Sequence, residues 1–169
     1  MKSFLLTILA LTLGFSAGAH KPYSVAPDEQ TGGLVFKGPI TLADLNGEPA
    51  FKWMKQGQSQ YKPDAAEIAL LAKRLPGHRF VIFMGTWCDD SQNLVPKLAK
   101  VLQELNFPES QISIWGVDRA KQSNGIDTKA YNIKLVPTII LYEGEKETGR
   151  IVESVHKSIE ADLAAMLRP

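Results

Sequence analysis

The sequence is poor in cysteine: among its 169 residues there is only one, Cys88. A single cysteine cannot form a disulfide within the chain, so the class of small secreted domains held together by disulfides is excluded. Stability has to come from a hydrophobic core, and a hydrophobic content of 44% is enough to build one. The length suits one domain better than two.

The chain also lacks an excess of either charge, with 19 Lys and Arg residues against 18 Asp and Glu. No basic run stands out, which argues against a nucleic-acid partner and against attachment to an anionic membrane surface. No glycine-rich phosphate loop is present. The three histidines, His20, His78 and His156, have no metal-ligand spacing with Cys88, and we expect them on the surface. The sequence thus predicts neither a cofactor nor a bound metal.

Long apolar runs are missing except at the N-terminus. Lys2 precedes a nearly continuous apolar stretch over residues 4–15, and small residues follow at 17–19 in an A-x-A arrangement. This pattern is typical of a cleavable signal peptide over residues 1–19, with the mature chain beginning at His20. The alternative, an uncleaved membrane anchor, fits less well because a spanning helix needs about 20 apolar residues. We therefore expect a periplasmic or secreted protein without a stable membrane anchor.

The next part of the chain carries weak secondary-structure signals. Residues 20–33 are polar and interrupted by prolines and a Gly-Gly pair, so a loose arm is predicted. Residues 34–42 fit an edge strand, because Pro39 is tolerated only at an edge or a strand end. Residues 44–63 give mixed signals. We treat residues 20–63 as an N-terminal extension with an edge strand.

From Asp64 onward the pattern predicts a domain over residues 64–169 in which helices and strands alternate. Asp64 and Glu67 resemble a capping box, and Ala72 falls on the apolar face of the helix that they begin. The predicted elements are a helix from 64 to 75, a strand over 79–85, a helix from about Cys88, a strand over 111–117, a short helix over 127–134, strands over 138–142 and 149–155, and a helix capped by Ser158. This order predicts an α/β fold with a mixed central sheet flanked by helices on both faces.

The segment 85–91 (GTWCDDS) lies between the clearest strand and the longest helix. A cysteine at a helix start meets unpaired backbone N–H groups and the positive end of the helix dipole. Both favour the thiolate, which is the reactive form, whereas Asp89 and Asp90 oppose it as like charges. Those carboxylates also suit a helix N-terminus on structural grounds alone. The alternative for Cys88 is simple burial, which is common for free cysteines.

Several motifs taken together resemble thioredoxin over about residues 64–169. A Trp-Cys pair, Trp87-Cys88, stands between a strand and a helix. Pro96 follows where thioredoxins carry a helix-kinking proline. The triplet 136–138 (Val-Pro-Thr) resembles the cis-proline loop that faces the cysteine, and residues 131–142 follow the thioredoxin pattern closely. The resemblance implies a thioredoxin-like fold.

The departures from thioredoxin narrow the expected chemistry. Ser91 replaces the second cysteine of Cys-x-x-Cys, and Ile82 stands where thioredoxin has a buried carboxylate. With one thiol, the chain can form a mixed disulfide through Cys88 but cannot resolve it internally. The site is also similar to a group of exported bacterial thioredoxin-like proteins with the pattern Gly-Thr-Trp-Cys-x-Asp-Ser, and residues 34–63 resemble that group rather than thioredoxin itself.

The resemblance implies thiol–disulfide exchange with protein thiols or disulfides, or with glutathione. Cys88 would attack a disulfide, the Pro137 loop would bind the substrate backbone as an added strand, and an external thiol would release the product. The expected catalytic residues are Cys88 and Ser91, the expected substrate-binding residues are Trp87, Val136, Pro137 and Thr138, and Asp89 and Asp90 flank the site.

Alternatives remain for two residues and for the function. Ser91 either donates a hydrogen bond to the thiolate or is an ordinary small helix residue. Trp87 either lines the partner groove or shields the sheet edge. The main rival function is a non-catalytic thioredoxin-fold module that binds proteins or peptides. Peroxide reduction through a sulfenic acid at Cys88 ranks lower, because the surroundings typical of a peroxidase are not visible.

Overall fold

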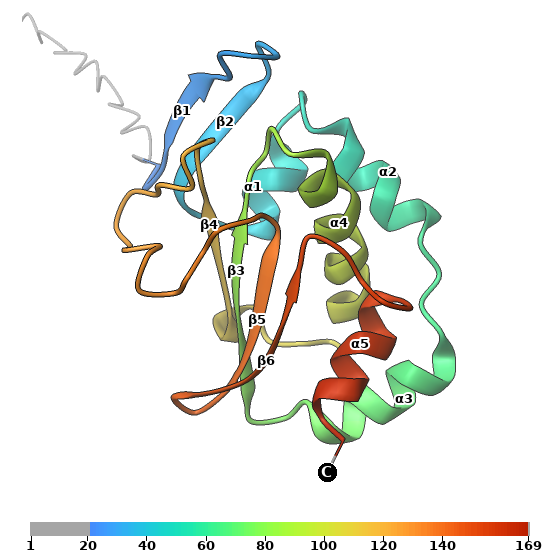
Figure 1. The fold of residues 1–169 in the computed structure, drawn as a ribbon. Helices are drawn as coiled ribbons and strands as arrows, with labels where there is room; N and C mark the ends of the chain where they lie inside the picture. Colours follow the sequence, from blue (N-terminus) through green and yellow to red (C-terminus); the bar gives the residue numbers. More distant parts are fainter. Residues whose placement is uncertain (1–20, 169) are drawn as a thin grey trace, which may run out of the picture.

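The computed structural model describes residues 21–168 (Figure 1), so the predicted signal peptide and its cleavage site lie outside the described residues. Within them the strands form a six-stranded sheet in the order β1-β2-β4-β3-β5-β6. The strands are β1 (Ser24–Pro27), β2 (Leu34–Ile40), β3 (His78–Met84), β4 (Ile112–Gly116), β5 (Thr138–Glu143) and β6 (Lys146–Val152). The helices are α1 (Leu42–Gly47), α2 (Lys52–Gln60), α3 (Ala65–Arg74), α4 (Asp89–Glu104) and α5 (Ile159–Met166), with a 3-10 turn η1 (Glu109–Gln111). In this part of the chain no helix is long and apolar enough to cross a membrane.

The sheet is mixed, as predicted. β3 runs parallel to β4 and antiparallel to β5, and β5 and β6 form an antiparallel hairpin. The last strand differs from its predicted position, residues 149–155, because it begins at Lys146 and ends at Val152. It stops there because Glu153 adopts a left-handed backbone conformation with φ 58°, which an extended strand does not allow.

Side chains along β3 point alternately to the two faces of the sheet, and an apolar cluster lies on each face. Phe80 and Ile82 point into the larger core, to which every helix from α1 to α5 contributes buried side chains. Val81 and Phe83 point to the opposite face, where a smaller apolar cluster is closed by the loop between β4 and β5. Figure 1 shows the helices gathered on one side of the sheet and this loop on the other.

Helices were expected on both faces, and the short helix predicted over 127–134 does not form. Residues 128–132 make hydrogen-bonded turns instead. The Asp127 carboxylate accepts from the Lys129 N–H at 3.0 Å, and Asn132 has a left-handed φ of 55°, so the turns do not propagate into a helix. The face that carries the smaller cluster is therefore covered by an irregular segment.

The N-terminal arm predicted over residues 20–33 is wrong for the residues described. Residues 24–27 form β1, which pairs with β2, and Tyr23 and Asp28 beside it are buried. β2 is consequently not an edge strand. Its first half pairs with β1 and its second half, from Gly38 to Ile40, pairs with β4.

Residues 44–63, which gave mixed signals, contain most of α1 and all of α2. α2 packs against α4, and this contact needs a glycine, because a methyl group at Gly57 would lie 2.7 Å from Cβ of Pro96. Pro96 lies inside α4, in the helix that the sequence predicted.

The start of α3 is only partly as predicted. Asp64 is the N-cap, and its carboxylate accepts from the N–H groups of Ala66 and Glu67. The return bond of a capping box is absent among the described contacts, because the Asp64 N–H donates to the buried Glu160 of α5 at 3.0 Å. Ala72, expected on the apolar face, is exposed, whereas Leu71 is buried.

The Tyr61 hydroxyl is expected to titrate far above the ordinary range. Burial and a 2.6 Å hydrogen bond to Glu160 raise the pKa of Tyr61 to about 12 from 10.0. A raised pKa in the fold means that its contribution to stability is complete below pH 10 and is lost as the pH rises through 12. Ultraviolet titration should show that Tyr61→Phe removes the phenolate ionisation step at a pH of about 12. Unfolding measured against pH should show that the same variant loses less stability in alkaline solution. Tyr131→Phe, on the opposite face of the sheet, is the matched control; if it has the same effect, the assignment to Tyr61 is wrong.

Candidate functional site

Cys88 lies at the end of the loop that connects β3 to α4, residues 85–88, which we call the site loop. It is the N-cap residue of α4, with extended backbone angles, and its carbonyl accepts from the Gln92 N–H at 2.9 Å. Its own N–H donates to the Gly85 carbonyl at 3.0 Å, which closes a tight turn. The side chain is half-buried, so the thiol is neither locked in the core nor free on the surface. The helix start predicted for Cys88 is confirmed.

The loop that precedes β5 holds the atoms opposite the sulfur. The Cys88 thiol donates to the Val136 carbonyl at 3.2 Å, and the Val136–Pro137 peptide bond is cis. The Thr138 hydroxyl donates to the Leu135 carbonyl at 2.7 Å, and the Pro137 carbonyl accepts from the Glu153 N–H at 2.8 Å. The structure thus brings the predicted triplet 136–138 together with Cys88, although β3 and β5 are separated by more than 50 residues of chain.

Ser91 lies beneath this surface, one turn into α4. It is fully buried, at 0% exposure, and its hydroxyl oxygen accepts from the Gly85 N–H at 3.2 Å. The observed partner of the Ser91 hydroxyl is therefore the site loop, while donation to a Cys88 thiolate stays a prediction. Ile82, at the position of thioredoxin's buried carboxylate, is 1% exposed within the larger core, so nothing acidic lies there.

Asp89 and Asp90 lie in the first turn of α4 and are exposed. Carboxylates there interact favourably with the helix dipole, and their exposure lets water screen their repulsion of a neighbouring thiolate. Their position agrees with the purely structural explanation, since carboxylates suit the N-terminus of a helix.

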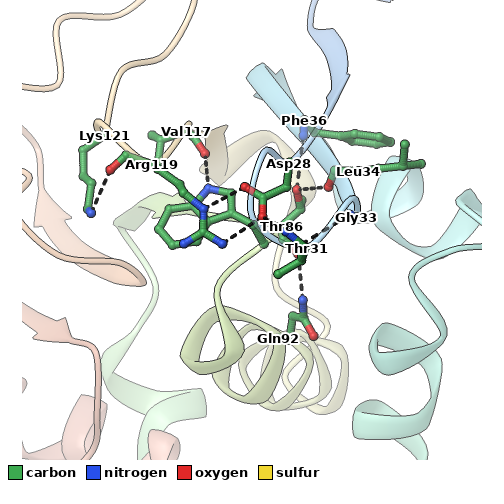
Figure 2. Close-up of polar contacts among 11 residues, drawn as sticks. Asp28, Thr31, Gly33, Leu34, Phe36, Thr86, Gln92, Val117, Arg119 and Lys121 are labelled. Atoms are coloured by element: carbon green, nitrogen blue, oxygen red, sulfur yellow. Dashed lines mark hydrogen bonds and ion pairs between the residues drawn. The ribbon is translucent and has the colours of Figure 1, made fainter.

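Trp87 is half-buried beside Cys88, and sequence reasoning missed the network around it. Figure 2 labels its members Val117, Arg119 and Asp28. The Trp87 indole N–H donates to the Val117 carbonyl at 2.9 Å. The Arg119 guanidinium lies 4.5 Å from the ring centroid, and the Lys121 ammonium lies 5.3 Å from it. Arg119 in turn binds the carboxylate of Asp28 at 2.7 and 2.8 Å.

The Asp28 carboxylate is unusual because it is charged and buried, with only 4% of the residue exposed. The Arg119 guanidinium, followed by hydrogen bonds from Thr31, holds the pKa of Asp28 well below its usual range. Asp28 in return raises the pKa of Arg119, and a smaller contribution comes from the negative charge of a Cys88 thiolate. A weak signal was present in the sequence. Asp28 and Thr31 form an Asp-x-x-Thr pattern between Pro27 and a Gly-Gly pair, which is typical of a structured turn.

Thr86 ties the same loop to the N-terminal hairpin. Its buried hydroxyl donates to the Leu34 carbonyl at 2.7 Å and accepts from the Phe36 N–H at 3.1 Å. The Thr86 carbonyl accepts from the Gln92 side chain at 2.8 Å. β2 therefore anchors the loop that carries Cys88 through its first half, which pairs with β1.

The described residues hold no cluster of three metal-ligating side chains. His156 is exposed, as expected, but the surface position predicted for His78 is wrong: it is 8% exposed. His78 begins β3, and its ring nitrogen lies 3.2 Å from the Leu75 carbonyl. His20 lies outside the described residues.

Comparisons with known proteins relate the chain to a family and to some solved structures. A search of curated proteins found no match. Two solved structures are similar: a Pseudomonas aeruginosa protein of unknown function, at 18% identity and TM-score 0.46, covering 73% of this chain and 74% of its own, and an HIV epitope-scaffold protein, at 16% identity and TM-score 0.48, covering 78% and 82%. The model of the family described as Thioredoxin matches residues 64–167, more than half of the chain. This protein belongs to the thioredoxin family, with the thioredoxin-like fold that its sequence predicted.

Proposed function

We propose that this protein carries out thiol–disulfide exchange through Cys88 alone. The Cys88 thiolate attacks one sulfur of a disulfide R–S–S–R′, the S–S bond breaks, and R′ leaves as a thiolate that takes up a proton. The product is a mixed disulfide between Cys88 and R. A second, low-molecular-weight thiol then attacks the sulfur of R, which frees Cys88 and transfers R to that thiol. Electrons are conserved, because one disulfide is consumed and one is formed.

The observation that carries this proposal is the meeting of a half-exposed thiol at a helix N-cap with the Val136 carbonyl and the cis Pro137 loop. The sulfur lies at the N-terminal end of α4, the positive end of the helix dipole, although no N–H of the helix bonds the Cys88 side chain.

The loop before β5 supports the binding of an extended substrate. Val136, whose carbonyl accepts from the Cys88 thiol, and Pro137 are buried, while the preceding Leu135 is 44% exposed. A polypeptide laid along this loop would place apolar side chains against Leu135 and Trp87, in the manner of an added strand. We propose protein disulfides or glutathionylated protein cysteines as the substrates. The leader-like residues 1–19 favour a site of action outside the cytoplasm.

The missing second thiol leads to a first test. The purified protein should form a stoichiometric adduct with oxidised glutathione, visible by intact mass, and Cys88→Ser should form none. Supplied only with thioredoxin reductase, it should not reduce insulin disulfides catalytically, because no second thiol resolves the mixed disulfide. Efficient turnover in that assay would contradict the monothiol mechanism.

A denaturation control separates the two main readings of the site. If the folded chain forms no adduct and the urea-unfolded chain does, Cys88 is an inert structural residue. The chain would then be a binding module that keeps the groove without the chemistry.

A further inference from the structure

The site loop is held by residues outside the matched family segment. Asp28 lies in the turn between β1 and β2, before the start of the match at residue 64. Its carboxylate receives four hydrogen bonds: two from Arg119, at 2.7 and 2.8 Å, and two from Thr31, at 3.0 and 2.7 Å. The Asp28 carboxylate and the Arg119 guanidinium, both planar, pair in the bidentate geometry that fixes a guanidinium most firmly.

Arg119, Gly85 and Val117 enclose the indole of Trp87. One side faces Arg119, at 4.5 Å. Another side lies so close to Gly85 that a methyl group at that position would be 2.6 Å from Cε2 of the ring. The N–H edge is fixed by the Val117 carbonyl. Gly85 also bonds the backbone of Cys88 and the hydroxyl of Ser91, so the position of Trp87 and that of the thiol depend on one turn.

We propose that Arg119 is a positioning residue for Cys88. Arg119 clamps Trp87 onto the Gly85 turn, and Asp28 of the N-terminal hairpin holds Arg119 in place. This inference rests on the proposed exchange reaction. It makes the hairpin, residues 21–40, part of the reactive site and assigns it a task that the family match does not include.

A simpler role for Arg119, as a free positive charge that stabilises the thiolate, makes opposite predictions. Because Asp28 neutralises the guanidinium, removing Asp28 would strengthen the positive field near Cys88 and speed the reaction. Under positioning, the loss of Asp28 releases Arg119 from Trp87 and slows the reaction. The two roles also differ for lysine at position 119, which keeps the charge but cannot pair with both carboxylate oxygens.

The test measures the second-order rate constant of Cys88 with oxidised glutathione in Arg119→Ala, Arg119→Lys and Asp28→Asn. Positioning predicts that all three slow the reaction, by about tenfold for Arg119→Ala. Arg79→Ala is the matched control, because Arg79 also stacks on an aromatic ring, Tyr142 at 4.3 Å, but at the opposite end of β3; it should stay within about twofold of the wild type. A faster Asp28→Asn, or full rescue by lysine, would overturn the proposal.

A second readout does not depend on Cys88 chemistry. In protein labelled with 5-fluorotryptophan, the fluorine resonance of Trp87, assigned through Trp87→Phe, should move in Arg119→Ala and Asp28→Asn and stay in place in Arg79→Ala. An unmoved Trp87 resonance would overturn the clamp even if rates fell. If wild-type Cys88 proves unreactive, the exchange proposal fails on its own, and this resonance still decides whether the clamp exists. Urea unfolding midpoints identify any variant that loses the fold.

Discussion

A Ser91→Cys variant is expected to gain dithiol reductase activity that the native chain lacks. Residues three apart in the first turn of a helix have Cα atoms about 5 Å apart, inside the range of about 4.4–6.8 Å that disulfides span. Ser91 already lies beneath the site loop, at 0% exposure. A thiol there would attack the Cys88 sulfur of the mixed disulfide, form an internal disulfide with Cys88 and release the substrate as a free thiol; thioredoxin reductase would then reduce the internal disulfide.

The expected result is insulin reduction by Ser91→Cys, with thioredoxin reductase as electron donor, at least about tenfold above the background given by the native chain. The glutathione adduct that accumulates on native Cys88 should disappear. Sulfur is a weaker acceptor than oxygen, so the Gly85 N–H that now bonds Ser91 loses part of its hydrogen bond, at a cost of about 1 kcal/mol.

Ser110→Cys supplies the matched control, because Ser110 is exposed in η1, which precedes β4 and lies away from the site loop. It adds a second thiol that cannot reach Cys88, and it should leave the adduct intact and insulin unreduced. If Ser91→Cys forms an internal disulfide with Cys88 and still reduces no insulin, the surface around Pro137 does not accept this substrate, and the choice of a protein disulfide is wrong.

Gly116→Ala is expected to destabilise the fold by about 3 kcal/mol, near the upper end for an inserted methyl group. Gly116 ends β4, between β2 and β3, and a Cβ there would overlap the carbonyl oxygen of Phe36. Backbone cannot turn aside as a side chain does, so the pairing of β2 with β4 has to open. Urea unfolding measures the change.

Gly149→Ala is the control for this second variant. Gly149 is also a strand glycine, but the atoms that a methyl group would meet belong to the flexible side chain of Met166. A cost of about 1 kcal/mol or less is expected there. Equal losses for both variants would show that strand glycines are sensitive in general, and that the contact with Phe36 is not the cause.

Most elements after residue 64 could be predicted because their signals are local. The apolar run of β3, the Asp64 cap and the stripe along α4 each need only neighbouring residues to be recognised. Cys88 and Val136 could be brought together only through the family resemblance, since nothing in their separate surroundings indicates contact across 48 residues of separation.

The N-terminal part could not be predicted from local pattern, because its partners are distant. β1 is four exposed residues that gain order only by pairing with β2. Asp28 looks like a loop residue until Arg119, 91 residues away, is placed against it. The helix expected over 127–134 failed for the opposite reason: its residues allow a helix, but turn bonds from Asp127 and the conformation of Asn132 prevail.

The change of partner along β2 has a consequence for what counts as one unit of this protein. The family match starts at residue 64, yet β2 covers the open side of β4, and Phe36, at 1% exposure, lies in the same core as Phe80. Cut at the start of the match, the chain would present a bare strand edge and an uncovered face of α4 to water, the conditions under which strands pair between molecules. Proteolysis or recombination that separates residues 21–63 from the remainder therefore divides a single folding unit.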